Sequence, residues 1–380
     1  MRKHMSIPSS TSHADAAWIS RALDLARRGI ALAHPNPMVG AVLVKHGRKI
    51  GEGFHVYDKR DHAEVVALKQ AGKNARGATL YVTLEPCCTT GRTGPCTKAI
   101  IAAGVTRVVA AMKDPNPAVA GRGLAELKRA GINVTIGAGE NSAKRLNEDF
   151  AKWIRTKIPF VTLKSALTLD GQIGARPGKS TQITGKASRE AVQRLRHSAD
   201  ALVTGIGTVL ADNPLLTDRS GEPRGRNLLR VVLDSHLRLP LTSRISKSAD
   251  RDVLVFTTQD TNSTKARALA KAGIEVVHTR NRRGHVCLDT VLAELGRRGI
   301  LHVLLEAGAE LNGAALSAGV VDKLVLFYAP KIMGTGGVPF ARIPAAQWFS
   351  KLPALRDITI TRCPPDLIVE GYFHDVYGNH

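Results

Sequence analysis

Residues that can bind a metal ion gather in one part of the chain. His62 and Glu64 form an H-x-E pair in the segment DHAEV, and three cysteines fall within EPCCTTGRTGPC, residues 85–96. The chain has five cysteines in 380 residues. Three in one short stretch indicate a metal site or a reactive group in a reduced compartment, rather than a disulfide framework.

The local patterns select three of these residues as ligands. Cys87 follows the apolar run TLYVTLE, so we expect it at the carboxyl end of a buried strand. Cys96 follows Pro95 and opens CTKAIIAAG, which has the pattern of a helix start, where a thiolate is favoured. Successive side chains diverge, so Cys88 is a poor ligand for the same ion. The sequence therefore predicts a zinc ion bound by His62, Cys87 and Cys96.

This ligand set predicts a specific chemistry. A catalytic zinc takes three protein ligands and keeps a fourth position for water, whose pKa it lowers. H-x-E followed by P-C is the pattern of nucleobase deaminases, in which the glutamate carries protons. The sequence predicts hydrolytic loss of ammonia from an aminated heterocycle, with Glu64 as the catalytic residue.

Two simpler interpretations remain open. Asp61 and Glu64 also fit an N-terminal capping box, in which Glu64 would only hold a helix end. A structural zinc would need a fourth protein ligand, which Cys88 or His55 could supply.

The composition is that of a soluble globular protein, and most of its positive charge fits a solvated basic surface. Residues 1–150 contain 22 basic and 12 acidic residues, and residues 151–380 contain 32 and 20, so the net charge of +22 is spread over both parts. Such a field attracts phosphorylated metabolites, dinucleotides or nucleic acid without choosing among them. No apolar run is long enough to span a bilayer. We expect residues 1–15 to form a disordered tail.

Helical and strand patterns alternate along the whole chain, which is typical of α/β folds. In the N-terminal part, helices are expected at 16–29, 62–72 and 96–104, with strands between them. The polar stretch 138–159 has the pattern of one connecting helix, so we place a domain boundary near Lys157. Beyond it, strands are expected at 160–173, 228–240, 252–258, 274–279, 300–308 and 323–334.

With these motifs in place, the chain resembles the bifunctional deaminase/reductases of riboflavin biosynthesis, the RibD/RibG type. NPMVGAVLV, GEGFH, HAE, YVTLEPC, GRTGPC and DPNPAVAGRGL match the deaminase half, and LKSALTLDGQI, ITG, GTVLADNPLLTDR, RVVLDS and LLEAGAELNGAAL match the reductase half. The resemblance implies a cytidine-deaminase-like three-layer αβα domain at residues 16–157. It implies a dihydrofolate-reductase-like α/β domain at residues 158–380.

The resemblance also implies the reactions and the site residues. The deaminase removes the 2-amino group of 2,5-diamino-6-(5-phosphoribosylamino)pyrimidin-4(3H)-one. The reductase uses NADPH to reduce the ribosyl group of the product, giving 5-amino-6-(5-phosphoribitylamino)uracil. The implied NADPH contacts are Thr184, Thr208, Asp212, Ser235 and the loop from Gly308. The implied substrate contacts are Ser180, Arg196, Leu216, Arg219 and Glu306, with both arginines suited to the phosphate.

The odd number and clustering of the cysteines predict a cytoplasmic enzyme, and the family resemblance implies a homodimer formed through the reductase domain. This chain departs from the family pattern at Gln182, where Trp is common, at Lys59 to Asp61, at Cys88 and Thr89, and at Gly94. None of these positions is a proposed zinc ligand or Glu64.

Two other functions are compatible with parts of the sequence. A nucleic-acid base deaminase with an accessory reductase-like domain would suit the basic charge, but an aromatic content of 4% offers few stacking surfaces for bases. A zinc-stabilised binding module without activity would require a zinc with four protein ligands.

Overall fold

The computed structural model describes residues 13–176, 178, 181–282, 284–343 and 354–378. The chain forms two compact units, residues 1–155 and 156–380, so the division lies two residues before the one expected after Lys157. No helix in the described ranges is both long enough and apolar enough to cross a bilayer.

The N-terminal tail expected over residues 1–15 is too long. Helix α1 (His13–Arg27) begins within it, and the Asp15 side chain is buried. That carboxylate accepts hydrogen bonds from the Tyr81 hydroxyl at 2.9 Å and from both terminal nitrogens of Arg107 at 2.7 and 2.8 Å. The expectation failed because Asp15 pairs with residues far along the chain. Residues 1–12 lie outside the described residues.

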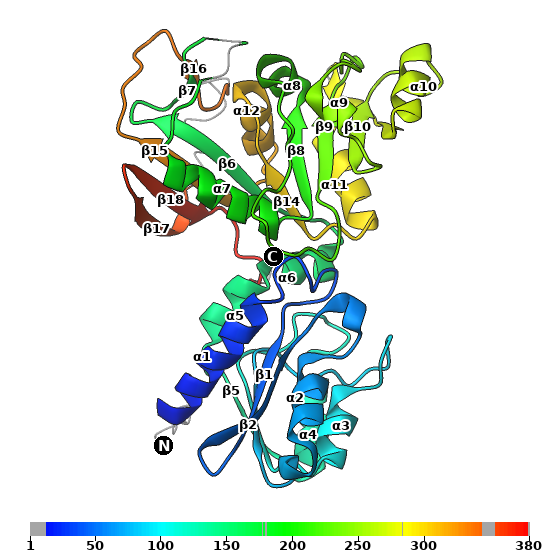
Figure 1. The fold of residues 1–380 in the computed structure, drawn as a ribbon, viewed down its shortest axis with the longest axis vertical. Coiled ribbons are helices and arrows are strands. Elements are labelled where there is room, and N and C mark those ends of the chain that lie inside the picture. Colours follow the sequence, from blue (N-terminus) through cyan, green and yellow to red (C-terminus); the bar gives the residue numbers. More distant parts are fainter. Residues whose placement is uncertain (1–12, 177, 179–180, 283, 344–353, 379–380) are drawn as a thin grey trace, which may run out of the picture. The chain divides into compact units, whose positions relative to one another are not determined.

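A five-stranded sheet forms the centre of the N-terminal unit (Figure 1). Its order is β2-β1-β3-β4-β5, with β1 antiparallel to both neighbours and β3, β4 and β5 parallel. The strands are β1 (Gly40–Lys45), β2 (Arg48–Phe54), β3 (Thr79–Val82), β4 (Arg107–Ala110) and β5 (Asn133–Ile136).

Helices cover both faces of this sheet, and glycines allow the closest contacts. A Cβ at Gly40 of β1 would lie 2.0 Å from a carbonyl oxygen of α1, and one at Gly51 of β2 would lie 2.3 Å from a carbonyl oxygen of α2. Figure 1 shows α1 and α5 on one side of the sheet and α2, α3 and α4 on the other. These helices are α2 (Ala63–Ala71), α3 (Cys96–Ala102), α4 (Arg122–Arg129) and α5 (Glu140–Leu146), with 3-10 turns at Tyr57–Lys59 and Gly72–Ala75. The three-layer αβα architecture is confirmed.

The expected connecting helix over 138–159 is two helices. Helix α5 ends at Leu146 and helix α6 spans Glu148–Thr156. Asn147 between them is fully buried, and its side-chain amide bonds to the backbone N–H and carbonyl of Met38 at 2.7 and 3.0 Å. This long-range contact interrupts a segment whose local pattern is continuously helical.

A nine-stranded sheet forms the centre of the C-terminal unit, in the order β11-β10-β9-β8-β14-β6-β15-β18-β17. Neighbouring strands are parallel from β11 to β15, and β15-β18 and β18-β17 are antiparallel. The strands are β6 (Phe160–Thr168), β8 (Ala201–Gly205), β9 (Leu229–Leu233), β10 (Val253–Thr257), β11 (Ile274–His278), β14 (His302–Leu305), β15 (Lys323–Ala329), β17 (Arg356–Cys363) and β18 (Asp366–Tyr372). Two small ladders pair β7 (Gln172–Gly174) with β16 (Val338–Pro339) and β12 (Asn281–Arg282) with β13 (His285–Val286).

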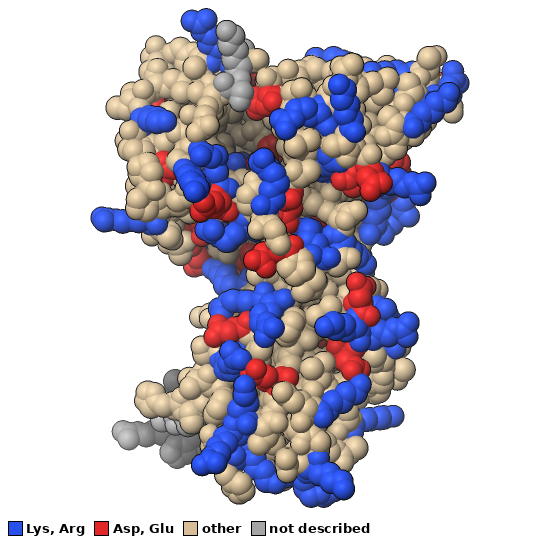
Figure 2. Space-filling model, viewed as in Figure 1, with Lys and Arg blue, Asp and Glu red and all other residues tan. Residues whose placement is uncertain are grey.

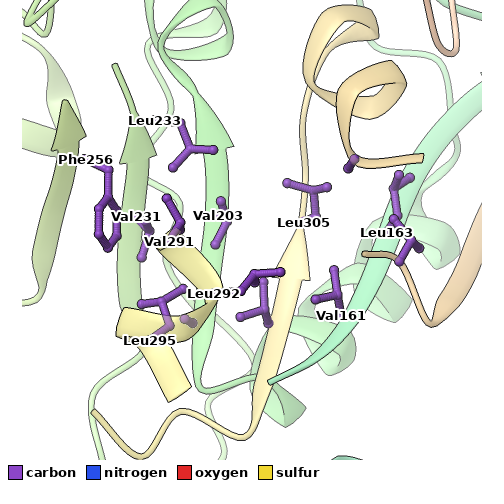
Figure 3. Packing of buried hydrophobic residues seen from close by; sticks show 14 of the residues in the cluster. Val161, Leu163, Val203, Val231, Leu233, Phe256, Val291, Leu292, Leu295 and Leu305 are labelled. Carbon is purple, nitrogen blue, oxygen red and sulfur yellow. The ribbon is translucent and has the colours of Figure 1, made fainter. Parts of the chain in front are cut away.

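Each face of the large sheet has its own apolar core. Val291, Leu292 and Leu295 of helix α11 pack on strand residues such as Val203 and Leu305 (Figure 3). The other face is covered by residues of α8, α9 and α10, and α7 packs on Val325 and Phe327. The helices are α7 (Lys186–Ser198), α8 (Ile206–Asp212), α9 (Arg244–Lys247), α10 (Thr264–Lys271), α11 (Leu288–Arg297) and α12 (Ala309–Ser317).

Strands β8, β17 and β18 are absent from the strands expected from the sequence. Residues Arg356 to Arg362 of β17 are all exposed, so this strand carries no buried face that alternation could reveal. Figure 2 shows Lys and Arg side chains scattered over both units with Asp and Glu between them, as the even division of charge indicates.

Candidate active sites

The three predicted zinc ligands lie together in the N-terminal unit. Their ligand atoms all fall within 4.8 Å of one another. The Nδ1 atom of His62 is 3.2 Å from the Cys96 sulfur and 3.5 Å from the Cys87 sulfur. Across the described ranges, no other set of His, Cys, Asp and Glu side chains converges in this way, and Cys88 and His55 are not in the set.

The element ends hold these ligands in place. His62 precedes the first residue of α2, Cys96 is the first residue of α3, and Cys87 follows β3. The backbone N–H of Cys96 donates to the Cys87 sulfur at 3.4 Å, and that of Thr97 donates to the Cys87 carbonyl at 3.2 Å. A soft donor set of one imidazole and two thiolates suits zinc, and it leaves one tetrahedral position open.

The contact between the two ligand thiols shifts their pKa values in opposite directions. Contact with Cys96, together with His62, lowers the pKa of the Cys87 thiol to about 4 although burial opposes this. The same contact and burial raise the pKa of Cys96. Cys87 is therefore the sulfur that is more readily ionised.

Glu64 does not cap the start of helix α2. It lies in the first turn of α2, is 3% exposed, and lines the same cavity as His62 and Cys87. The residue at the helix N-cap is His62, which makes no side-chain cap, and Asp61 pairs instead with Lys69. The capping-box interpretation is therefore wrong. Burial raises the pKa of Glu64 to about 7, with His62 opposing the rise.

A cavity of about 330 Å³ opens over this cluster. Asn36 and His55 line it, and the His55 ring lies between the Asn36 side-chain nitrogen and the Asp61 carbonyl, at 3.0 Å from each. Burial lowers the pKa of His55, so the ring is neutral, with Nδ1–H donating to the carbonyl. These partners explain why His55 is not a fourth metal ligand.

Glu85 joins the cysteine segment to another wall of this cavity. Its buried carboxylate accepts four backbone N–H bonds, from Asp114, Gly121, Gly123 and Leu124, at 2.8 to 3.2 Å. A Cβ at Gly123 would lie 2.0 Å from the carbonyl oxygen of the next residue, Pro86. Glycine is therefore required at position 123. The four hydrogen bonds to Glu85, here called the Glu85 clasp, fix the loop that begins at Asp114.

Several residues of this cavity were not expected from the sequence to be site residues. Asp114 and Asn116 line it, and burial raises the pKa of Asp114 to about 6. Arg92 lines it too, with its guanidinium 4.1 Å from the centre of the Tyr57 ring, and so does Thr89. The motifs DPNPAVAGRGL and GRTGPC contain Asp114, Asn116 and Arg92. These motifs were the sequence features from which the three cavity residues could have been identified.

A second cavity, of about 380 Å³, lies in the C-terminal unit at the carboxyl ends of β8 and β14. Thr208, Asp212 and Gly308 line it, three of the five residues expected to contact NADPH. A Cβ at Gly207 or Gly308 would meet no atom within 4 Å, so these turns leave open space beside the backbone. Glycine turns that lead from strands into helices suit a dinucleotide phosphate.

The other expected cofactor contacts lie outside the lining of this cavity. The Thr184 carbonyl accepts a bond from Arg189 at 3.1 Å, and the Ser235 hydroxyl accepts one from the Val286 N–H at 3.1 Å. Of the expected substrate contacts, Ser180 lies outside the described residues. Leu216 is buried in a left-handed conformation, with φ of 56°. Such a conformation in a bulky residue occurs where the surrounding structure enforces it.

The two arginines expected to act alike differ in their surroundings. Arg196 is largely buried and makes two bonds to the Glu306 carboxylate, at 2.7 and 3.1 Å, and one to the Thr217 carbonyl. Arg219 is exposed, and its guanidinium makes no hydrogen bond to the residues described. The structure thus gives Arg196 a carboxylate partner, and leaves Arg219 accessible to a phosphate.

Lys164 was not expected from the sequence, yet it belongs to the same cluster. Its ammonium lies 3.3 Å from Glu306, because β6 and β14 are parallel neighbours and the paired residues Leu163 and Leu305 directly precede Lys164 and Glu306. Burial alone would raise the pKa of Glu306, but Lys164 and Arg196 outweigh it and hold the pKa at about 2. The sequence feature that could have identified Lys164 is its position as a lysine inside the apolar run FVTLKSALTL.

Comparison with known proteins gives matches over both units. Residues 12–112 match the cytidine and deoxycytidylate deaminase zinc-binding region, and residues 159–369 match the RibD C-terminal domain. The riboflavin biosynthesis protein RibD of Aquifex aeolicus is 42% identical over 85% of this chain and 88% of its own. That of Escherichia coli K12 is 40% identical over 93% and 98%. The solved Acinetobacter baumannii RibD has a TM-score of 0.85 at 38% identity, over 94% of this chain and 98% of that one.

The fold and the two sites define a zinc-dependent deaminase joined to a nucleotide-dependent reductase of dihydrofolate-reductase-like fold. The chain belongs to the RibD family. It is a bifunctional enzyme of riboflavin biosynthesis that uses zinc in its deaminase domain and NADPH in its reductase domain. Membership of the RibD family therefore stands in place of the two other functions considered above, a nucleic-acid base deaminase and an inactive zinc-binding module.

Proposed function

We propose that residues 16–157, with the start of α1 added, carry out the deamination of 2,5-diamino-6-(5-phosphoribosylamino)pyrimidin-4(3H)-one. The observation that carries this proposal is the cluster of His62, Cys87 and Cys96 beside a cavity that His62, Cys87 and the buried Glu64 line. His62, Cys87 and Cys96 hold the zinc, which, when bound, acts as a Lewis acid that makes hydroxide available at neutral pH.

Glu64 is the proton carrier of this reaction. Its carboxylate takes a proton from the attacking water and returns protons to the ring nitrogen and to the departing amino group. Water thereby replaces the amino group with a carbonyl oxygen, and ammonia leaves. Arg60 and Arg92, the two arginines in the lining of this cavity, are suited to the substrate phosphate.

Residues 158–380 carry out the second reaction, in which NADPH supplies a hydride to the ribosyl carbon. Thr208, Asp212 and Gly308 hold the cofactor in the glycine-lined cavity. Thr184 and Ser235, outside that lining, are proposed as further cofactor contacts. The substrate is held by Ser180, Leu216, Arg219 and the charged cluster of Arg196 and Glu306. Within that cluster, Arg196 orients Glu306, and Arg219 contacts the phosphate.

We also propose that the enzyme is a homodimer formed through the reductase unit. The outer strand β17 exposes Ile358 and Ile360 to 56% and 68%, and Leu367 of β18 is 39% exposed. The register places Ile360 and Leu367 on one face, since Arg362, two residues after Ile360, pairs with Leu367. An outer strand with exposed apolar residues marks an interface.

Sedimentation equilibrium tests the dimer. The wild type should sediment at twice the monomer mass, and Ile360→Lys should shift it toward the monomer without loss of zinc. A wild type that stays monomeric at micromolar concentration would contradict the proposal.

The use of NADPH and the five free cysteines favour a cytoplasmic enzyme.

One incubation tests the catalytic proposal. The zinc-loaded enzyme is mixed with the diaminopyrimidinone phosphate, with and without NADPH, and the products are read by mass spectrometry. Without NADPH the product should have an oxygen in place of one amino group, and with NADPH it should also gain two hydrogens. Recovery of unchanged substrate in both mixtures would refute the assignment.

A further inference from the structure

Helix α6 presents an apolar face to the deaminase cavity. Phe150, Trp153 and Ile154 lie at positions i, i+3 and i+4 of this helix, and all three line the cavity that contains His62 and Glu64. The segment that the sequence marks as a connection between domains is therefore also part of a deaminase wall.

Several contacts fix this helix against the cavity. The Asn147 amide bonds to both backbone groups of Met38, next to Pro37 and Val39 in the cavity lining. The Asp149 carboxylate lies 3.1 Å from His34 Nε2, and both side chains are at least nine-tenths buried. The first turn of α6 is thus attached to residues 34–38, a segment that also lines the cavity, and Trp153 follows one turn later.

The cavity therefore has a polar side and an apolar side. Asn36, His55, Asp114 and Asn116 supply hydrogen-bonding groups, and the face of α6 supplies the aromatic surface. A flat heterocycle with amino and carbonyl groups at its edge and an apolar face above and below requires these two kinds of wall. Only 4% of the residues of this chain are aromatic, yet two of them are on this face.

We infer that Trp153 packs against the heterocyclic ring of the deaminase substrate and determines part of its affinity. The inference rests on the proposed function of this cavity. It adds a substrate contact on α6, the last helix before the reductase strand β6.

Tryptophan fluorescence tests this contact without turnover. The chain has three tryptophans, Trp18, Trp153 and Trp348, the last outside the described residues. The zinc-loaded Glu64→Gln enzyme is titrated with the diaminopyrimidinone ribosyl phosphate, in three versions that also carry Trp18→Phe, Trp153→Phe or Trp348→Phe. Binding should quench the emission in the first and third versions, and the quenching should be lost in the Trp153→Phe version.

Kinetics provide the second measurement. Trp153→Ala should raise the deaminase KM about 10-fold with little change in kcat, the scale of one lost stacking contact on a base. Trp153→Phe should restore most of the affinity. The zinc content, and the reductase kcat/KM on deaminated substrate, should match wild type. The same rise in KM should occur with dephosphorylated substrate, because the contact is to the ring.

The outcomes separate this inference from the proposed function. Ligand binding seen by calorimetry, with quenching unchanged in the Trp153→Phe version, would overturn the ring contact and leave the deaminase function standing. A KM effect that vanishes on dephosphorylated substrate would also overturn it. No binding by any version would overturn the deaminase function and the inference with it.

Discussion

The Arg196 guanidinium and the Glu306 carboxylate form a two-point ion pair, from Nε to Oε1 at 2.7 Å and from Nη2 to Oε2 at 3.1 Å. Both side chains are 12% exposed, and Lys164 adds a second cation beside the carboxylate. A buried pair of this kind loses several kcal/mol when one partner is removed, because the other is left uncompensated. We therefore expect Arg196 to stabilise the fold, in addition to the substrate contact proposed for it.

This pair predicts different effects at the two arginines. Arg219→Ala should reduce the reductase kcat/KM by a factor equivalent to about 2–3 kcal/mol, and the loss should nearly vanish on dephosphorylated substrate. Arg196→Ala should reduce activity on both substrates and also lower the free energy of unfolding. Steady-state NADPH oxidation and urea titration measure both effects. Equal losses on the two substrates for Arg219→Ala would exclude phosphate recognition by that residue.

The low pKa of Glu306 predicts a pH dependence of stability. Its pKa of about 2 when folded lies below the ordinary value of 4.5, so its stabilising contribution is present above pH 4.5 and is lost as the pH falls toward 2. The difference in unfolding free energy between wild type and Glu306→Gln should shrink by about 2 kcal/mol between pH 6 and pH 3. Urea titrations across this range measure it, and a constant difference would contradict the charged pair.

The zinc ligands can be tested by metal content. Cys87→Ser and Cys96→Ser should lose zinc and deaminase activity, because each removes one of three ligands. Cys88→Ser is the matched control, since it changes the adjacent cysteine outside the ligand set, and it should keep both. Zinc loss from the Cys88 variant would require a different set of ligands.

The Glu85 clasp predicts a loss of stability near the zinc site. Glu85→Gln places an amide nitrogen where backbone N–H groups point, so we expect the free energy of unfolding to fall by about 3 kcal/mol. Gly123→Ala should have a comparable effect, because its Cβ would meet the Pro86 carbonyl at 2.0 Å. Urea titration checks both. Gly91→Ala, where a Cβ meets no atom within 4 Å, is the control.

The zinc site could be predicted from the sequence because each ligand lies beside a local signal. His62 and Cys96 are at helix starts and Cys87 follows a strand, so local patterns place all three near one edge of the sheet. The break at Asn147 could not be predicted, because it depends on Met38, which is 109 residues away. The pairing of Arg196 with Glu306 could not be predicted for the same reason, because the two residues are 110 positions apart.

Local patterns also missed features that have no periodic signature. Strand β17 is exposed on both faces and lacks the alternation that marks a half-buried strand. Helix α6 has an apolar face, but the sequence does not show that this face meets the deaminase cavity. The fold class and the gathering of the zinc ligands near Glu64 were therefore predictable, and the contacts between distant segments required the structure.

The central claim is that one chain contains two chemically separate sites, and the Glu64→Gln variant tests it most directly. Zinc content and the rate of NADPH oxidation are measured on the deaminated substrate, and ammonia release on the aminated one. We predict normal zinc, ammonia release reduced by several orders of magnitude, and NADPH oxidation near the wild-type rate. A parallel collapse of NADPH oxidation, or undiminished ammonia release, would contradict the account.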